Sequence, residues 1–406
     1  MPTNRQLFLR HMAQTSEFPL MIEVEKAEGV YMYNTDGQRL IDLISGIGVS
    51  NVGHRHPKVV EAVKEQADKY MHLMVYGEFV QGPQVQLAAA LAETLPPTLD
   101  NCYLVNSGSE AVEGALKLAK RYTGRYKFIS CRQSYHGSSH GSLSVSGSED
   151  YKHRYRPLLP GISHVHYGAV DELDRIKDDT AAIIMETVQG EAGVRMADKA
   201  YFRALRKRCD ETGTLLILDE IQCGFGRTGT FWAFEQTGIV PDILLSAKGM
   251  GGGMPIGTFI ASREIMHVLT NNPILGHITT FGGHPVSAVA SLATLNIIRE
   301  EKLAEQAPAK GERFRQQLKH PLISEIRNMG LMMAVDFGSF DILKPVIDEA
   351  IKLGVVTDWF LFCDNSMRIA PPLTISEEEI DEACGLILKA CDIVMEHSDV
   401  PHQQDA

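Results

Sequence analysis

Long apolar runs are missing from this sequence, since no stretch approaches the roughly 18 uncharged apolar residues that a transmembrane helix needs. Basic residues are also in the minority: 39 lysines and arginines stand against 51 aspartates and glutamates, which gives a net charge of −12. This excess of negative charge argues against a nucleic acid or an anionic membrane surface as a partner. A small anionic ligand stays compatible with it, because a local pocket can be positive on an acidic protein.

Paired cysteines and metal-ligand spacings are absent too. The seven cysteines form no CxxC pair and no cluster with histidines, so we expect reduced thiols and no metal site. The sequence contains no repeats or low-complexity tracts, which excludes solenoids and propellers. Its first residues include Arg5 and Arg10 but no unbroken apolar segment of a signal peptide. We therefore expect a cytoplasmic protein.

What is present is a long chain with an alternating pattern. Its 406 residues exceed the roughly 250–300 at which a single core stops growing, so more than one domain is expected. Short apolar runs predict strands at Cys102–Val105, Lys127–Ser130, Ala181–Met185, Leu215–Leu218, Asp242–Leu245 and Thr258–Ala261. Helices are predicted between them at Glu110–Tyr122 and Tyr201–Thr212. This alternation predicts an α/β fold with a mostly parallel sheet, covered by helices on both faces.

The two ends of the chain have a different texture. Val30–Tyr33 and Leu40–Leu43 flank a turn and predict a hairpin. After residue 285 helical segments mix with short strands, and Ser376 with Glu379 forms a capping-box pattern that starts a last helix. We predict that residues 1–50 and 286–406 together form a smaller α+β domain, and that residues 51–285 form the large domain.

A polar segment follows the first predicted strand and opens the next helix. It reads NSGSE at 106–110, and it contains Ser107, Gly108 and Ser109. Backbone N–H groups and the helix dipole converge at such a place, so it can bind a phosphate. An ordinary serine N-cap explains the same residues equally well.

Asp219 and Glu220 follow four large apolar residues, at the carboxyl end of a predicted strand. Ligands of α/β sheets bind at this end of the strands. A buried carboxylate needs a cationic partner to stay ionised, and a metal ion or a protonated heterocyclic nitrogen would serve. A carboxylate that caps the following loop is the structural alternative.

Lys248 follows another predicted strand and precedes a run of glycines. A lysine among small residues suits an amine held close to a bulky ligand, where desolvation lowers its pKa and makes it a nucleophile. A phosphate site, a strand-end carboxylate and such a lysine on one sheet together point to pyridoxal phosphate. The phosphate would bind at the helix start, the pyridinium at Asp219 and the aldehyde at Lys248.

The segment LDEIQCGFGRTG at 218–229, followed by Lys248, resembles the class III aminotransferases (subgroup II, fold type I). Further matching motifs occur in family order over most of the chain: NVGHRHP at 51–57, NSGSEA at 106–111, YHG at 135–137, ETVQGEAG at 186–193, TFGG at 280–283 and RIAPPL at 368–373. The length is similar to that of the acetylornithine and ornithine aminotransferase branch.

The resemblance implies a role for each matching residue. Lys248 and Asp219 would be catalytic, the lysine as nucleophile and proton carrier and the aspartate as partner of the pyridine nitrogen. The other implied cofactor contacts are Ser107, Gly108, Ser109, Tyr135, His136, Gln222 and Thr280, the last reaching the phosphate from the neighbouring subunit of a homodimer. Glu191, Arg368 and Thr279 would bind substrate, with Glu191 and Arg368 as a pair that opens for a 2-oxo acid.

Two departures from the family pattern concern the substrate. Ser138 stands where many relatives have an arginine for the substrate α-carboxylate, and His284 replaces a common asparagine. Serine cannot imitate the bidentate clamp of arginine. The resemblance implies transfer from a terminal amine, as in acetylornithine, ornithine or 4-aminobutyrate, to 2-oxoglutarate by a ping-pong mechanism. Because Ser138 lacks the clamp, lysine and diamines also stay open as donors. A racemase, an epimerase or a decarboxylase on the same scaffold is the alternative, and a cofactor-free binding protein is a more distant one.

Overall fold

The computed structural model describes residues 2–75 and 77–397, and its centre is a seven-stranded sheet in the order β4-β10-β9-β8-β7-β5-β6. Neighbours are parallel except that β10 runs antiparallel to β4 and β9. The strands are β4 (Asn101–Val105), β5 (Lys127–Cys131), β6 (Ile162–Val165), β7 (Thr180–Glu186), β8 (Leu215–Asp219), β9 (Ile243–Ser246) and β10 (Gly257–Ala261). All the predicted strands of this region are present, and β6 is an addition.

Successive residues of the central strands face two different cores. On β7, Ala182 and Ile184 pack into one apolar cluster with α5 (Gly108–Thr123). Ile183 and Met185 pack into the other cluster, with α4 (Gly82–Glu93), α7 (Lys199–Thr212) and α9 (Pro285–Glu300). Since every residue of β7 and β8 is buried, the sheet is covered on both faces, as a parallel sheet requires.

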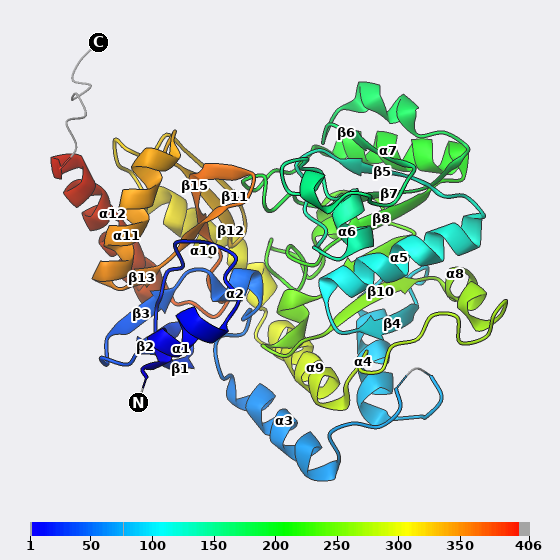
Figure 1. The fold of residues 1–406 in the computed structure, drawn as a ribbon, viewed down its shortest axis with the longest axis horizontal. Coiled ribbons are helices and arrows are strands. Elements are labelled where there is room, and N and C mark those ends of the chain that lie inside the picture. The colour runs from blue at the N-terminus through cyan, green and yellow to red at the C-terminus, as the bar shows by residue number, and fades with distance from the viewer. Residues whose placement is uncertain (1, 76, 398–406) are drawn as a thin grey trace.

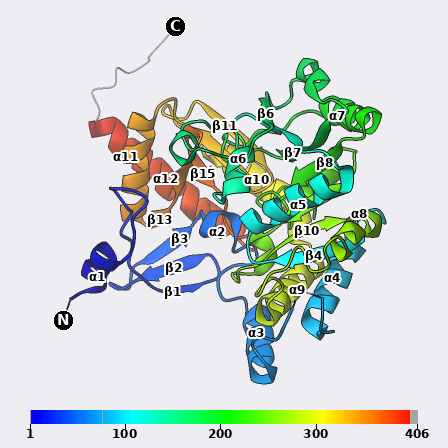
Figure 2. The same ribbon diagram turned by 45° about the vertical axis from the view of Figure 1, so that its right-hand side comes forward.

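The two ends of the chain meet in a second lobe, which Figures 1 and 2 both show beside the large sheet. Its first sheet has the order β1-β2-β3-β13, and the parallel pairing of β3 with β13 joins the N-terminal segment to the C-terminal one. Its second sheet, β11-β12-β15-β14, is antiparallel. The strands are β1 (Val24–Glu28), β2 (Tyr31–Asn34), β3 (Arg39–Asp42), β11 (Glu325–Met329), β12 (Met332–Asp336), β13 (Val355–Val356), β14 (Asp358–Phe360) and β15 (Cys363–Ile369).

Helices complete this lobe and connect it to the sheet. Helices α10 (Leu303–Gln317) and α11 (Phe340–Leu353) pack against α12 (Glu377–His397). The capping box predicted for α12 is present, since Ser376 Oγ accepts from the Glu379 N–H and the Glu379 carboxylate accepts from the Ser376 N–H. The remaining helices are α1 (Asn4–His11), α2 (Ser45–Gly48), α3 (Pro57–Lys69), α6 (His140–Val145), α8 (Arg263–His267), and the short 3₁₀ turns His153–Tyr155, Val170–Arg175, Ala233–Gln236, Lys248–Gly251 and Val268–Thr270.

The architecture confirms the predicted fold class: a large parallel-dominated sheet with helices on both faces and an α+β lobe built from both chain ends. The domain boundaries at residues 50 and 285 stay predictions. No helix in the part of the chain that the structure describes is long and apolar enough to cross a membrane. All seven cysteines are free thiols, and all but Cys102 and Cys363 are buried.

Candidate active site

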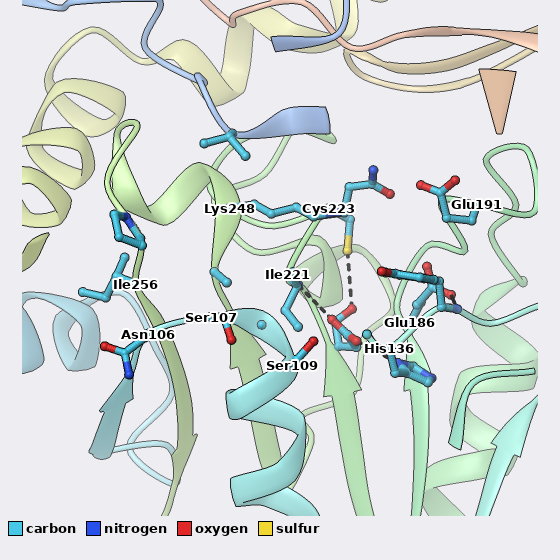
Figure 3. Close-up of a pocket in the computed structure, with 18 of the residues that line it drawn as sticks. Asn106, Ser107, Ser109, His136, Glu186, Glu191, Ile221, Cys223, Lys248 and Ile256 are labelled. Carbon is cyan, nitrogen blue, oxygen red and sulfur yellow. Dashed lines mark hydrogen bonds and ion pairs between the residues drawn. The ribbon is translucent and has the colours of Figure 1, made fainter. Parts of the chain in front are cut away.

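A cavity of about 440 Å³ lies at the carboxyl ends of β7, β8 and β9 (Figure 3). This volume lies in the range of pockets that enclose small organic ligands, roughly 300–1,000 Å³. Most of the predicted site residues line it together: Ser107, Gly108, Ser109, Tyr135, His136, Glu191, Asp219, Gln222 and Lys248. Arg368, Thr279 and Thr280 are not among the lining residues.

The start of α5 forms one end of the cavity. Ser107 is the N-cap, and its hydroxyl accepts a hydrogen bond of 3.2 Å from the Glu110 N–H. Within the described residues, the N–H groups of Gly108 and Ser109 have no hydrogen-bond acceptor, as is usual for a first helical turn. A Cβ on Gly108 would lie 2.9 Å from Cδ1 of Ile221, so a larger residue would push against that side chain. The prediction of an N-cap and the prediction of an anion site both fit this helix start.

Asp219 ends β8 and is held by two hydrogen bonds. Its Oδ2 lies 2.7 Å from Nδ1 of His136, and its Oδ1 accepts from the Ile221 N–H at 3.0 Å. A carboxylate only accepts, which assigns the proton to Nδ1. His136 Nε2 is buried and has no hydrogen-bond partner among the residues described. His136 thus orients the Asp219 carboxylate by donating to its Oδ2. The sequence alone did not indicate this contact.

The neighbouring carboxylate has a different function in the fold. Glu220 is buried and accepts from the Ala233 and Phe234 N–H groups and from the Thr187 hydroxyl. Burial raises its pKa to about 8, although these hydrogen bonds act in the opposite direction. The alternative of a loop-capping carboxylate is therefore correct for Glu220, while Asp219 faces the cavity.

Lys248 begins the turn after β9 with a positive φ of 47°, a conformation that costs a side-chain-bearing residue of order 1–3 kcal/mol. No hydrogen bond or ion pair of its amine is present in the described part of the chain. Burial lowers its pKa, and the positive charge of Arg368 lowers it further, while Glu191 and Asp219 act in the opposite direction. A lysine with a lowered pKa presents more of the neutral, nucleophilic amine.

Glu186 is a site residue to which the sequence analysis gave no role. It ends β7 in register with Asp219, lines the cavity, and accepts from the N–H groups of Tyr135 at 3.0 Å and Gly190 at 2.8 Å. Burial raises its pKa to about 7; His136 lowers it and Asp219 raises it further. The strand predicted at Ala181–Met185 ends one residue before it, so the reasoning applied to Asp219 would have found it.

Tyr135 and Gln222 are half-buried, whereas Ser138 is exposed. Burial and the charge of Glu191 raise the pKa of the Tyr135 hydroxyl. Gln222 packs so closely on Gly190 that a Cβ there would lie 1.8 Å from its Oε1. Ser138 is exposed, and its N–H donates to Ser109 Oγ at 3.4 Å.

Glu191 and Arg368 form a buried bidentate pair at the other end of the cavity. Nη1 and Nη2 of Arg368 lie 2.8 and 3.0 Å from the two carboxylate oxygens of Glu191. Burial alone would raise the pKa of Glu191, but the charge and hydrogen bonds of Arg368 lower it overall. Glu191 lines the cavity and pairs with Arg368, whereas the predicted opening of this pair for a 2-oxo acid stays a prediction.

The segment before α9 lies beside the cavity. Thr279 Oγ1 accepts from the Asn106 side-chain amide at 3.3 Å, while Thr280 is exposed. His284 occupies the N-cap position of α9 and stacks on His72 at 5.5 Å. The role of Thr280 in a neighbouring subunit stays a prediction.

The residues present fit pyridoxal phosphate. The free N–H groups at the start of α5 suit a phosphate, the fixed carboxylate of Asp219 suits a pyridinium, and the Lys248 amine suits an aldehyde. Asp219 lines the cavity as an acceptor held by two donors, which favours a cationic ring at that position. Among residues 2–75 and 77–397, no three His, Cys, Asp or Glu side chains are placed to hold a metal ion.

Comparisons with known proteins agree with this site. The family model "Aminotransferase class-III" matches residues 12–391. An acetylornithine aminotransferase from Methanopyrus kandleri is 40% identical over 385 residues, which cover 94% of this chain and 96% of that protein. Among solved structures, a transaminase from the marine bacterium Virgibacillus has a TM-score of 0.91 at 27% identity, covering 97% of this chain and 99% of that one.

Ornithine aminotransferase from Toxoplasma gondii ME49 is a further solved relative. It has a TM-score of 0.89 at 29% identity and covers 98% of this chain and 97% of its own. Another structure of the T. gondii enzyme is described with partial occupancy of pyridoxal phosphate at the active site. The family match, the fold and the fit of the cavity agree, so this chain belongs to the class III aminotransferases and is a transaminase that depends on pyridoxal phosphate.

Proposed function

We propose that this aminotransferase moves the terminal amino group of an ω-amino acid to 2-oxoglutarate by a ping-pong mechanism, in which both substrates use the same cavity in turn. Acetylornithine, ornithine and 4-aminobutyrate are examples of such donors. The observation that carries the proposal is the buried Glu191–Arg368 pair at the cavity edge. Relatives named for acetylornithine and for ornithine support the class of donor.

The Glu191–Arg368 pair would suit a site that accepts two substrates of different charge. While Glu191 covers the guanidinium, the described lining of the cavity holds no free cation except Lys248. In this closed arrangement the charge of Arg368 is compensated by Glu191, so the cavity suits the amine end of a donor rather than a carboxylate. When the Glu191 carboxylate rotates away, Arg368 presents two parallel N–H donors to a carboxylate of the 2-oxo acid.

Several residues would hold the cofactor, each through a different group. The N–H groups of Gly108 and Ser109 and the nearby hydroxyl of Ser107 would bind the phosphate. Asp219, oriented by His136, would keep the pyridine nitrogen protonated. Tyr135, His136 and Gln222 line the space for the ring. When bound, pyridoxal phosphate withdraws electrons from the substrate carbon, which stabilises negative charge there.

Lys248 would hold and move the proton of the reaction. In its neutral form, Nζ takes the proton from the carbon that bears the donor's amine and later returns one. The lowered pKa supports this role, because a lysine with an ordinary pKa would be protonated at neutral pH and could not accept a proton. The fixed turn after β9 keeps the amine at the cavity.

The active form would be a homodimer in the cytoplasm. Thr280 is exposed on this chain and does not line its own cavity, which is compatible with a contribution to the site of a second copy. Thr279 lies next to Asn106 of the cavity wall and would contact substrate or position that wall.

A donor panel tests the proposal. Each donor is incubated with 2-oxoglutarate or with pyruvate, and the amino acid formed is compared with the donor consumed. We expect equal amounts of glutamate and of donor aldehyde with an ω-amino acid and 2-oxoglutarate. Donor that is racemised or decarboxylated without consumption of a 2-oxo acid would contradict the proposal.

A further inference from the structure

Arg368 contacts a second carboxylate besides Glu191. Its Nε donates to Oδ1 of Asp358 at 2.8 Å, and its Nη2 also donates to the Trp359 carbonyl at 3.1 Å. The guanidinium carbon lies 4.5 Å from the centroid of the Phe360 ring. The edge of the guanidinium that carries Nε and the fork of Nη1 and Nη2 are therefore held by different partners.

The two carboxylates belong to different parts of the fold. Asp358 and Arg368 are paired residues of the antiparallel strands β14 and β15, so Asp358 belongs to the same sheet as the arginine. Glu191 comes from the loop after β7 in the large domain, whose base is closed by two backbone hydrogen bonds between Gln189 and Arg195. The Glu191 carbonyl accepts from the Phe362 N–H at 3.0 Å, which anchors its backbone, and its carboxylate also accepts from the Leu361 N–H at 3.1 Å. Rotation of the Glu191 side chain would break its contacts with Leu361 and Arg368 and expose the fork.

The two carboxylates also differ in their relation to the cavity. Glu191 lines the cavity, whereas Asp358 does not. A substrate carboxylate can reach the position of the Glu191 carboxylate from the cavity, whereas Asp358 does not line the cavity and its backbone is paired with β15. The Nε hydrogen bond therefore persists while the fork changes partners.

We propose that Asp358 is a positioning residue for the exchange of carboxylates at Arg368. It fixes the guanidinium plane through Nε, so that the carboxylate of a 2-oxo acid finds the fork already oriented when Glu191 leaves. This inference rests on the proposed function, in which Arg368 binds the 2-oxo acid. Loss of the Nε acceptor would free the arginine to change rotamer, and a bidentate contact tolerates little change in angle.

The charge of Asp358 has little effect on the exchange itself. A negative charge at that position weakens the attraction of Arg368 for Glu191 and for a substrate carboxylate by similar amounts, because both occupy the same fork. The orientation of the Arg368 guanidinium then decides how well its fork binds a substrate carboxylate. An asparagine at 358 keeps an acceptor oxygen for Nε, whereas an alanine removes it.

The test compares the holoenzymes of the wild type, Asp358→Ala and Asp358→Asn in steady-state assays with varied donor and varied 2-oxoglutarate. Asp364→Ala is the matched control, because Asp364 is an exposed carboxylate on the same strand as Arg368. We expect Asp358→Ala to raise the KM for 2-oxoglutarate roughly 10-fold or more, with kcat and the donor KM within about 2-fold of the wild type. Asp358→Asn is expected to restore the KM to within about 3-fold of the wild type, and Asp364→Ala to leave it unchanged.

Binding of glutarate, a dicarboxylate without a reactive carbonyl, gives a readout independent of turnover. We expect the dissociation constant of glutarate to rise most in Asp358→Ala, little in Asp358→Asn and not at all in Asp364→Ala. The inference is overturned if asparagine is as damaging as alanine, if donor and acceptor constants rise together, or if glutarate binding does not distinguish the variants. A wild type that binds glutarate but never consumes 2-oxoglutarate would instead contradict the proposed function. The dissociation constants of glutarate for the variants would then still test the role of Asp358.

Discussion

The two ends of the cavity are built by different means. At the sheet end, the chemistry-bearing groups are fixed by the backbone: Asp219 ends a buried strand, Lys248 begins a turn at positive φ, and the start of α5 presents main-chain N–H groups. At the other end, which we call the gate end, a side chain after β7 of the large sheet, Glu191, contacts a side chain of the second lobe, Arg368. Under the proposed function, the backbone fixes the groups that carry out the reaction, while a side-chain pair that can exchange partners selects the carboxylate that enters.

Lys248 at the sheet end is the residue whose loss has the largest expected effect. Lys248→Ala removes the nucleophile and proton carrier, so turnover and the yellow colour of the lysine-bound cofactor should both disappear while the fold is kept. Activity and the visible absorbance spectrum are measured, and circular dichroism checks the fold. Normal turnover without added amine would show that another group is the nucleophile.

Asp219→Asn should keep the cofactor but lose rate on the order of 10³-fold or more. The amide still accepts a hydrogen bond but cannot keep a pyridine nitrogen protonated, so the electron-withdrawing power of the ring falls. Measured kcat with saturating cofactor gives the effect. A rate within a few-fold of the wild type would mean that Asp219 only braces His136 and the Ile221 N–H.

Glu186 at the same end should make the cofactor-free protein less stable as the pH rises. Its pKa is raised from 4.5 to about 7 in the folded state, so the folded protein keeps a proton that the unfolded chain releases. Between about pH 4.5 and pH 7 this removes up to about 3 kcal/mol from the free energy of unfolding, an order-of-magnitude value. Below that window the full stability is present.

Glu186→Gln should abolish this pH-dependent part. Urea unfolding of both cofactor-free proteins at pH 5 and pH 8 measures it, and the comparison cancels the titration of Glu220, which is present in both. Unfolding free energies that change in parallel with pH would show that Glu186 does not titrate in this range.

Arg368→Ala at the gate end should raise the KM for 2-oxoglutarate by roughly 30-fold or more, since a desolvated arginine–carboxylate pair contributes on the order of 2–5 kcal/mol when one partner is truncated. Its kcat at saturating 2-oxoglutarate should change much less. An unchanged KM would show that another residue binds the 2-oxo acid.

Ser138→Arg should have the smallest effect and sharpen the difference between donors. A guanidinium beside Tyr135 would supply the clamp that this sequence lacks, and use of donors with an α-carboxylate should improve by roughly 3- to 10-fold in kcat/KM. Donors without a carboxylate serve as the control. An equal change for both donor types would indicate a change in loop structure rather than a new contact.

The sequence predicted the sheet end better than the gate. Strand-end positions follow from apolar runs, so Asp219 and Lys248 were found from local pattern, and Glu186 was within reach of the same reasoning. Strand β6 was missed because Ser163 and His164 interrupt its apolar run. Contacts that depend on strand order or register, such as that of His136 with Asp219, leave no pattern in the local sequence from which they could be predicted.

The contact of Asp358 with Arg368 is a second example of a contact that the local sequence does not predict. It depends on the register of β14 against β15, which shifts between Trp359 and Phe360. A one-residue change of register would place the two side chains on opposite faces. The family motif that contains Arg368 begins at that residue and does not extend back to Asp358.

The separate rates of the two half-reactions test the contrast between the two ends most directly. The cofactor absorbance of the wild type and of Arg368→Ala is followed after mixing with an ω-amino donor alone, and then with 2-oxoglutarate alone. We predict an unchanged donor half-reaction, within about 2-fold, and a 2-oxoglutarate half-reaction that needs roughly 30-fold more substrate to reach the same rate. Equal losses in both half-reactions would contradict the account, because they would mean that the gate and the catalytic end are one inseparable unit.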